Sequence, residues 1–432
     1  MIRDPYRLRR RSLLTGAAAA ATLAAAAACG DDGPAGTAED PIEISFEWWG
    51  DDTRAGLTKD AIALFEKKNE GIKVQANFSD FPTYWEGMTG RMASRDLPDV
   101  FQMDYSRLRQ FGSNGMLLPL EGVVKTDDFR DEGFLDTAKL DGQLIAVPAA
   151  GNTLGLLYRA DWYEANGVAA PAPGYSWDDY KSAIATLTPA LGEGKWGGGD
   201  WAGQYHFMEL WLRQQGGSFY TEDGKALNFT DAQLVEFWAT SADLYADGLV
   251  PPVETTIEWT EDGLVQDALG SEIGWDNFMP GFAPTVAENG GALALAAPPS
   301  LDPANLGLYL KPSMQLVISA TTEQAEAAAK FIDFFLGDPE AIAILGTNRG
   351  IPATNTGLEN VELDEYAQAV LDYEASVSQY LTTPPPAPPA ATGAIEVKFG
   401  EIYQQVQYGE MSGDDAAALF FTEAETLLAA EQ

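Results

Sequence analysis

Aromatic and acidic side chains follow two apolar stretches in the first quarter of the chain. Trp48 and Trp49 end one stretch, and Asp104, Tyr105 and Ser106 follow another. Aromatic rings pack against apolar surfaces, whereas carboxylates and hydroxyls take part in hydrogen bonds. These residue types therefore offer the chemistry of binding, through ring contacts and hydrogen bonds.

Catalysis that depends on His or Cys is restricted, because the chain has one of each, His206 and Cys29. A Ser-His-Asp or Cys-His enzyme would need His206 as its base, and we interpret this residue as structural. No disulfide can form within the chain, and no zinc or copper site can be built from His and Cys clusters. The Gly-rich run at 191–201 lacks the ending of a phosphate loop, and the acidic residues lack calcium-loop spacing. No cofactor and no metal are expected.

The elements that position the first candidates follow from hydrophobic periodicity. Apolar residues alternate with polar ones over 42–48 and 72–78, which predicts two strands, and a third is predicted at 100–103. Helical patterns lie between them, so the order β-α-β-α-β predicts parallel strands with crossover helices. Ligands of such sheets bind beyond the carboxyl ends of the strands. We therefore expect the aromatic and acidic groups to meet at one edge of the sheet.

Further along the chain, turn and cap signals predict additional elements. Asp141-Gly142 predicts a tight turn between two short extended pieces. Ser176 with Asp179 is a capping box that opens a helix at 177–187. An apolar stripe over 328–335 predicts a helix that stops at Gly337, after which Asp338 caps the next helix. The tract Pro384–Pro389 is typical of an extended connector before a last helical tail.

The N-terminus has the pattern of an export signal. A basic head containing Arg10 and Arg11 precedes an Ala-rich apolar stretch, which predicts a twin-arginine-like signal peptide over 1–28. Cys29 lies where this stretch ends and resembles the acylated first residue of a bacterial lipoprotein, followed by a flexible tether over 29–40. The alternative is ordinary cleavage after an Ala-x-Ala sequence, which would release a soluble protein.

Length and charge limit the class of protein. The 432 residues are enough for two or three domains. The chain has 65 Asp and Glu against 26 Lys and Arg, a formal net charge of -39. Such a chain repels phosphate backbones, so nucleic acid is excluded as a partner.

Five stretches resemble the extracellular solute-binding proteins of the carbohydrate ABC-importer group, the family that includes maltose-binding proteins. Their order and spacing along the chain carry the resemblance, together with the lipoprotein-like leader. They are ALFEKKNEGIKV at 63–74, LPDVFQMDYSRLRQFGSNGMLLPL at 97–120, DGQLIAVPAAGNTLGLLYRADWYEANGV at 141–168, SEIGWDNF at 271–278 and the segment 316–353 that ends in NRGIPA.

The resemblance implies an α/β fold of the two-lobed periplasmic-binding-protein type (type II), with a hinge and an interlobe cleft. Each lobe would be discontinuous in sequence. The first lobe is expected at 41–151 plus 296–336, and the second at 152–295 plus 337–432. The ligand would lie in the cleft, and the lobes would close over it.

A sugar ligand implies aromatic faces against the ring and polar groups against its hydroxyls. The resemblance carries over Met103 and Ser106 after the third strand, with Asp104 and Tyr105 between them, Asn152 at the crossover, and Trp275 with Asn277 in the second lobe. Residue type and placement add further ligand-binding candidates, namely Trp48, Trp49, Tyr84, Trp85, Trp201 and Arg349.

Each candidate also has a structural interpretation. Trp48 and Trp49 cannot both point inward, since neighbours on a strand face opposite sides. Asp104 and Ser106 suit a helix N-cap equally well. The corresponding structural roles are a packed loop anchor for Trp85, a hinge turn for Asn152 and a surface or interlobe ion pair for Arg349.

We expect a non-enzymatic protein that captures a sugar or oligosaccharide outside the membrane and delivers it to ABC permease subunits. It would be a monomer, anchored by lipid at Cys29 to the outer face of the cell membrane. Two alternatives stay open. One is a secreted glycosidase that uses a pair of carboxylates. The second is a lipoprotein that serves as a carbohydrate sensor or adhesin.

Overall fold

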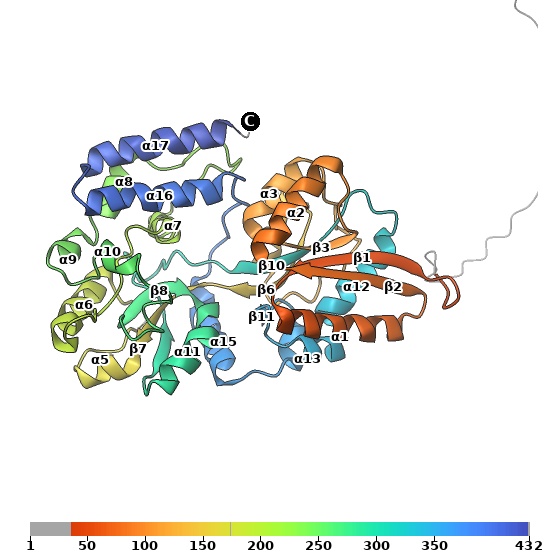
Figure 1. Cartoon of the computed structure of the whole chain (residues 1–432), viewed down its shortest axis with the longest axis horizontal. Coiled ribbons are helices and arrows are strands. Elements are labelled where there is room, and N and C mark those ends of the chain that lie inside the picture. Colours follow the sequence, from red (N-terminus) through yellow and green to blue (C-terminus); the bar gives the residue numbers. More distant parts are fainter. Residues whose placement is uncertain (1–35, 173, 431–432) are drawn as a thin grey trace, which may run out of the picture. The chain divides into compact units, whose positions relative to one another are not determined.

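The computed structural model describes residues 36–172 and 174–430 (Figure 1). The expected signal peptide at 1–28, Cys29 and the first part of the expected tether therefore lie outside the described residues. Within the described ranges, none of the helices has the length and apolar character needed to span a membrane.

The larger sheet has six strands in the order β11-β6-β10-β3-β1-β2. β1 runs parallel to β2 and to β3, whereas β10 is antiparallel to both β3 and β6. The strands are β1 (Ile42–Trp49), β2 (Ile72–Ser79), β3 (Val100–Met103), β6 (Val147–Asn152), β10 (Lys311–Ile318) and β11 (Ile351–Pro352). The predicted parallel β-α-β-α-β unit and the α/β class are confirmed.

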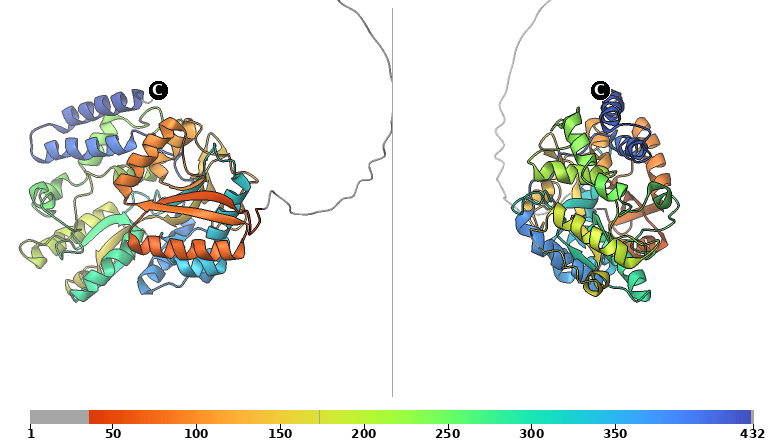
Figure 2. Two further views of the ribbon diagram at one scale, coloured as in Figure 1. Left: turned by 45° about the vertical axis from the view of Figure 1, so that its right-hand side comes forward. Right: turned by 90° about the vertical axis from the view of Figure 1, so that its left-hand side faces the viewer.

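Helices cover both faces of this sheet. In Figures 1 and 2, α1 and α13 lie on one side of it, and α2 and α3 lie on the other. The helices of this part are α1 (Asp52–Lys68), α2 (Phe81–Ser94), α3 (Tyr105–Ser113), α4 (Glu132–Asp136), α12 (Ala325–Gly337), α13 (Pro339–Leu345) and α14 (Asn355–Asn360). Because both faces are covered, all four residues of β3 are buried, including the polar side chain of Gln102.

A second group of elements surrounds a three-stranded antiparallel sheet in which β7 lies between β8 and β9. Its strands are β7 (Leu154–Arg159), β8 (Ser271–Trp275) and β9 (Leu293–Ala296). Its helices are α5 (Ala160–Ala165), α6 (Trp177–Leu191), α7 (Tyr205–Gln214), α8 (Asp231–Trp238), α9 (Ala242–Ala246), α10 (Val253–Thr256), η1 (Asp276–Phe278), α11 (Met279–Glu288), α15 (Glu365–Val377), η2 (Ser378–Tyr380), α16 (Thr392–Gln407) and α17 (Gly413–Ala429).

Local signals in the sequence coincide with the observed turns and helix starts. The capping box of Ser176 and Asp179 is present, and Asp338 caps α13 through two backbone amides. Asp141 and Gly142 have φ values of 51° and 79° between β4 (Lys139–Leu140) and β5 (Gln143–Leu144). Glycine adopts positive φ without a steric penalty, which explains the tight turn at this point.

Each sheet has its own hydrophobic core, and the chain passes between the two cores several times. The first core contains residues from β1, β3, β10 and α12, and the second contains residues from α6, α7, α16 and α17. The grouping differs from the expected boundaries in two places. Residues 339–353 pack on the first core, because α13 lies against α1 and β11 pairs with β6. Residues 306–309 pack on the second core, ahead of β10.

Candidate functional site

A cavity of about 200 Å³ lies where elements of the two cores meet. Its walls come from the start of α3, one face of α7 and the loop at 218–224. The residues just before and at the start of β10, the Pro-rich segment 384–389 and the start of α16 complete them. The lining residues are Asp104, Tyr105, Ser106, Tyr205, His206, Glu209, Ser218, Phe219, Tyr220, Thr221, Gly224, Tyr309, Lys311, Pro385, Pro386, Ala387, Pro388, Thr392, Gly393 and Glu396.

The wall from the first core is the N-terminus of α3. Asp104 is its N-cap, and its Oδ1 accepts hydrogen bonds from the Ser106 amide at 2.9 Å and the Ser106 hydroxyl at 2.5 Å. The Tyr105 hydroxyl donates to the carbonyl oxygen of Pro385 at 2.5 Å. Asp104 thus caps the helix and lines the cavity at once, so the two interpretations of this residue do not exclude each other.

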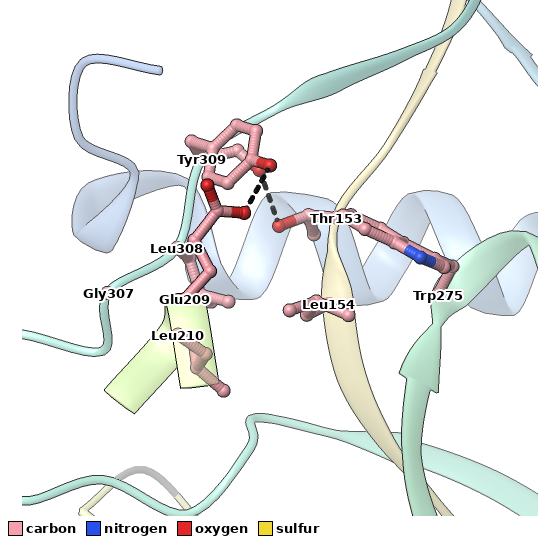
Figure 3. A pocket seen from close by; sticks show the side chains of 8 residues that line it. All are labelled: Thr153, Leu154, Glu209, Leu210, Trp275, Gly307, Leu308 and Tyr309. Atoms are coloured by element: carbon pink, nitrogen blue, oxygen red, sulfur yellow. Dashed lines mark hydrogen bonds between the residues drawn. The ribbon is translucent and has the colours of Figure 1, made fainter. Parts of the chain in front are cut away.

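The wall from the second core is one face of α7. Tyr205 and Glu209 lie one turn apart on this helix, so both side chains face the cavity. The Tyr309 hydroxyl donates to Oε2 of Glu209 at 3.1 Å (Figure 3). Burial raises the pKa of the Glu209 carboxyl.

His206 follows Tyr205 and also lines the cavity, although the sequence analysis gave it a structural role. Its Nε2 lies 3.4 Å from Oε1 of Glu396, and its ring centroid is 5.4 Å from that of Trp275. Burial, with the Lys311 ammonium nearby, lowers the pKa of His206 well below its usual range. The imidazole is therefore neutral at pH 7.

Aromatic rings and unpaired hydroxyls form the inner surface of the cavity. The Tyr205 ring lies 4.4 Å from that of Phe219 and 6.3 Å from that of Tyr220, measured between centroids. The hydroxyls of Tyr220 and Thr392 are buried and make no hydrogen bond of good geometry among the described residues. Burial raises the pKa of Tyr220, and the neighbouring hydroxyls of Thr392 and Tyr205 partly offset that rise. A buried polar group without a partner costs free energy, and a ligand hydroxyl that met it would remove that cost.

Lys311 is the single Lys or Arg among the described residues that line the cavity. Its Nζ lies 4.6 Å from the ring centroid of Trp275, within the range of a cation–π contact. Lys311 is at the start of β10, opposite Asn152 of β6, and so projects from the strands that connect the two cores.

Closely packed residues lie beside Glu209 and Tyr309, where the chain crosses between the cores (Figure 3). The Thr153 hydroxyl donates to the carbonyl oxygen of Tyr309 at 2.8 Å. Thr153, Leu154 and Trp275 lie beside Tyr309 and Glu209, and the space between them does not hold a water molecule. This packing fixes Glu209 and Tyr309 in position.

Arg109 of α3 binds the segments that cover the cavity. Its Nε donates to the carbonyl oxygen of Ala387 at 2.7 Å, and its Nη1 and Nη2 donate to those of Asp223 and Glu222 at 3.2 and 3.3 Å. A Cβ atom on Gly224 would lie 2.9 Å from Arg109 Nε, so the guanidinium lies directly against this glycine, whose φ of +69° also favours glycine. One side chain from the first core therefore holds both the Pro-rich segment and the loop at 218–224.

The structure brings some of the predicted site residues to this cavity or next to it. Asp104, Tyr105 and Ser106 line it. Trp275 contacts His206 and Lys311, which both line it. Asn152 donates from Nδ2 to Oδ1 of Asn277 at 2.9 Å, so these two predicted residues contact each other at the crossover.

Four predicted aromatic residues lie in the first core and do not line the cavity. Trp48 is 0% exposed and packs between the rings of Phe46 and Phe78, because β1 is covered on both faces. The remaining three are buried in a ring cluster around Phe81 at the end of β1 and the start of α2. They are Trp49, Tyr84 and Trp85.

Trp201 and Arg349 also lie away from the cavity. The Trp201 indole packs against the rings of Trp177 and Tyr180 in the second core. Arg349 is buried beneath the larger sheet, where Nε donates to Oε1 of Gln102 at 3.1 Å. Burial, together with the nearby Arg54, lowers the pKa of Arg349 to about 9.

Several lining residues were not among the sequence candidates. The clearest signal for them is the Tyr205–Glu209 spacing, which places a carboxylate one helical turn from an aromatic ring and inside the otherwise apolar stretch 207–212. Lys311 and Glu396 carry no local signal, because only the tertiary fold brings them to the cavity. Within the described ranges, no group of three or more His, Cys, Asp and Glu side chains is arranged to hold a metal ion.

Comparisons with known proteins agree with this architecture. Residues 50–342 match the family described as bacterial extracellular solute-binding protein. A solved extracellular solute-binding protein of family 1 from Alicyclobacillus acidocaldarius is 28% identical, with a TM-score of 0.74 over 90% of this chain and 99% of that one.

Two further solved structures share the fold at lower identity. A periplasmic oligogalacturonide-binding protein from Yersinia enterocolitica, in complex with saturated digalacturonic acid, is 19% identical with a TM-score of 0.76, covering 90% of this chain and 99% of that one. An ABC substrate-binding protein from Listeria monocytogenes, in complex with cycloalternan, is 20% identical with a TM-score of 0.71, covering 90% of this chain and 100% of that one.

Proposed function

Because this chain belongs to the family of bacterial extracellular solute-binding proteins, we propose that it captures a sugar in the cavity between its two cores and delivers it to an ABC permease. The observation that carries the proposal is the composition of that cavity. Tyrosine rings, carboxylates and unpaired hydroxyls from both cores face one enclosed space. Rings suit the apolar faces of a pyranose, and the polar groups suit its hydroxyls.

The two cores would act as the lobes of a clamp. A ligand that contacts Tyr105 on one side and Tyr205 on the other favours the closed arrangement, since only that arrangement makes both contacts. The volume of about 200 Å³ is below the roughly 300–1,000 Å³ of pockets for drug-sized ligands, which favours a mono- or disaccharide. The solved relatives that hold digalacturonic acid and cycloalternan support a sugar as the ligand class.

The proposal predicts that a sugar stabilises the purified protein and is recovered unchanged. A thermal-shift screen over neutral mono- and disaccharides should identify ligands, and calorimetry should give one site per chain. At 100 times Kd, binding stabilises the folded state by about 2.7 kcal/mol. Failure of every sugar to shift the melting temperature would contradict the proposal. Release of hydrolysis products would favour the glycosidase alternative.

A variant separates binding from stability in the same assay. Tyr220→Phe removes a hydroxyl that makes no hydrogen bond of good geometry among the described residues, so the free protein should lose little stability. Its affinity for the sugar should fall about tenfold, because one hydrogen bond to the ligand is lost. Tyr408→Phe, at an exposed tyrosine, is the matched control and should change neither quantity.

We also propose that the protein is exported as a monomer and held at the outer face of the membrane by acylation of Cys29. Cys29→Ser should release the protein into the medium, because a serine cannot carry the thioether-linked lipid. Fractionation of cells that express each form measures this. If the serine variant stays with the membrane, anchoring through Cys29 is refuted.

A further inference from the structure

We infer that the cavity accepts sugars without an acidic group and discriminates against uronic acids. This inference rests on the proposed sugar-binding function and narrows it to a class of ligand. Three observations support it: the charged groups that line the cavity, the interactions that each of them already makes, and the buried hydroxyls that lack a well-formed hydrogen bond.

Three carboxylates from three different elements line the cavity. They belong to Asp104 at the N-cap of α3, Glu209 on α7 and Glu396 on α16. Against them stands the ammonium of Lys311, while His206 is neutral at pH 7 because burial lowers its pKa. A ligand carboxylate would therefore face three acidic side chains and one ammonium in the lining of the cavity, although burial raises the pKa values of Glu209 and Glu396. The space is partly shielded from water, where charge interactions are strong.

The single ammonium is already surrounded by groups that stabilise it. Its Nζ faces the ring of Trp275 at 4.6 Å. Burial raises the pKa values of Glu209 and Glu396, and the same ammonium partly offsets that rise at both groups, together with Arg213 at Glu209. A ligand carboxylate that bound Lys311 would have to displace these interactions.

The carboxylates keep unfilled acceptor positions. Oδ1 of Asp104 accepts from Ser106, and Oε2 of Glu209 accepts from Tyr309. No hydrogen bond is observed at Asp104 Oδ2 or at Glu209 Oε1 among the described residues. Each ionised carboxylate offers about four acceptor positions. Free acceptors of this kind match the hydroxyls of a sugar or the ammonium of an amino sugar, both of which donate, but not another carboxylate.

A second, independent observation points to hydroxyl groups on the ligand. Tyr220 and Thr392 are 9% and 5% exposed, and their side-chain oxygens have no hydrogen-bond partner among the described residues that surround the cavity. A hydroxyl both donates and accepts, so two ligand hydroxyls can satisfy these groups in either direction. The wall of the cavity thus has two neutral hydroxyl groups beside more carboxyl groups than cations.

The test compares matched neutral and acidic sugars on the wild-type protein. After the screen identifies a neutral ligand, calorimetry at about pH 7.5 and about 0.15 M salt measures its uronic acid counterpart, for example galactose against galacturonic acid. We expect the acidic sugar to bind at least about tenfold more weakly. Equal or tighter binding of the acidic sugar would overturn the inference and leave the proposed function intact. Binding of neither kind would instead count against the proposed function.

A charge-neutralising variant tests the cause. Asp104→Asn with Glu396→Gln keeps the side-chain shapes and the N-cap, because Asn also caps helices. The ratio of neutral to acidic affinity should fall by about tenfold toward one. Glu401→Gln, an exposed position on the same helix α16, is the matched control and should leave the ratio unchanged. An unchanged ratio in the folded double variant would overturn the inference.

Lys311→Gln gives a second measurement if the double variant does not fold. Removing the ammonium takes away the one cation in the lining of the cavity, so the discrimination against the uronic acid should increase. If the ratio of neutral to acidic affinity falls instead, the Lys311 ammonium does not offset the carboxyl groups, and the inference is overturned.

Discussion

Replacing Arg130 with Met lowers the free energy of unfolding by about 3–5 kcal/mol at pH 8, because it leaves a buried acid without its partner. Arg130, before α4, forms an ion pair with Glu374 of α15, and the two side chains are 10% and 5% exposed. The Oδ1 of the fully buried Asp276 has no hydrogen-bond partner among the described residues, and the charges of Arg130 and Glu374 both act on this carboxyl. Removing the guanidinium therefore leaves two buried carboxyls uncompensated at the crossover.

The loss of unfolding free energy in Arg130→Met should depend on pH. Burial raises the pKa values of Glu374 and Asp276, and the like charge of Glu374 raises that of Asp276 further. An acid whose pKa is higher in the folded state than in the unfolded state binds more protons in the folded state at pH values between the two pKa values. Lowering the pH therefore stabilises the folded state relative to the unfolded state. The stability deficit should be smaller at pH 5 than at pH 8.

Urea unfolding of both proteins at the two pH values measures this effect. Lys139→Met, which breaks an exposed ion pair with Asp136, is the control and should change stability by less than about 0.5 kcal/mol. A deficit of the same size at pH 5 and pH 8 would show that the loss comes from packing rather than from the uncompensated acids.

Replacing Arg109 with Leu is expected to increase the dissociation rate of bound sugar roughly 30-fold. The guanidinium donates three hydrogen bonds to carbonyl oxygens of the segments that cover the cavity. Hydrogen bonds to charged groups contribute about 1.5–3 kcal/mol each, and water replaces part of that when the segments move away. A net loss of about 2 kcal/mol in the covered state corresponds to the stated rate change.

Stopped-flow tryptophan fluorescence measures the dissociation rate. Hydrogen exchange at Ala387 measures how often the segments that cover the cavity move away, and it needs no ligand. Arg107→Leu, two residues earlier on α3, is the matched control, since its guanidinium lies over the ring of Trp85 and not on the cover. An unchanged dissociation rate with faster exchange at Ala387 would mean that the cover does not control release.

The sequence predicts the elements best where the signal is local. Alternation of apolar residues is enough to place β1 and β2, and single side chains identify the starts of α6 and α13. The same reasoning places Asp104, Tyr105 and Ser106 at the wall of the cavity, because the carboxyl end of a parallel strand has a fixed relation to the helix after it. The expected meeting with Trp48 and Trp49 does not occur, since both are buried in the first core.

The rest of the site depends on contacts between distant segments. Lys311 and Glu396 reach the cavity from β10 and α16, and no short-range pattern brings them near Asp104. Trp48 illustrates the opposite case. An aromatic residue at the end of a strand suits a core as well as a site, and the covering of β1 on both faces decides between them. The placement of residues 339–353 likewise follows from the packing of α13 on α1.

The position of β10 has a consequence for biosynthesis. This strand fills the centre of the larger sheet, between β3 and β6, yet it is translated more than two hundred residues after β3. At roughly 5–20 residues per second, the ribosome needs on the order of tens of seconds to reach it. Throughout that interval the facing edges of β3 and β6 have no partner between them. The nascent chain thus passes through a period in which its half-made sheet can pair with the wrong strand, and a holding chaperone would act at that stage.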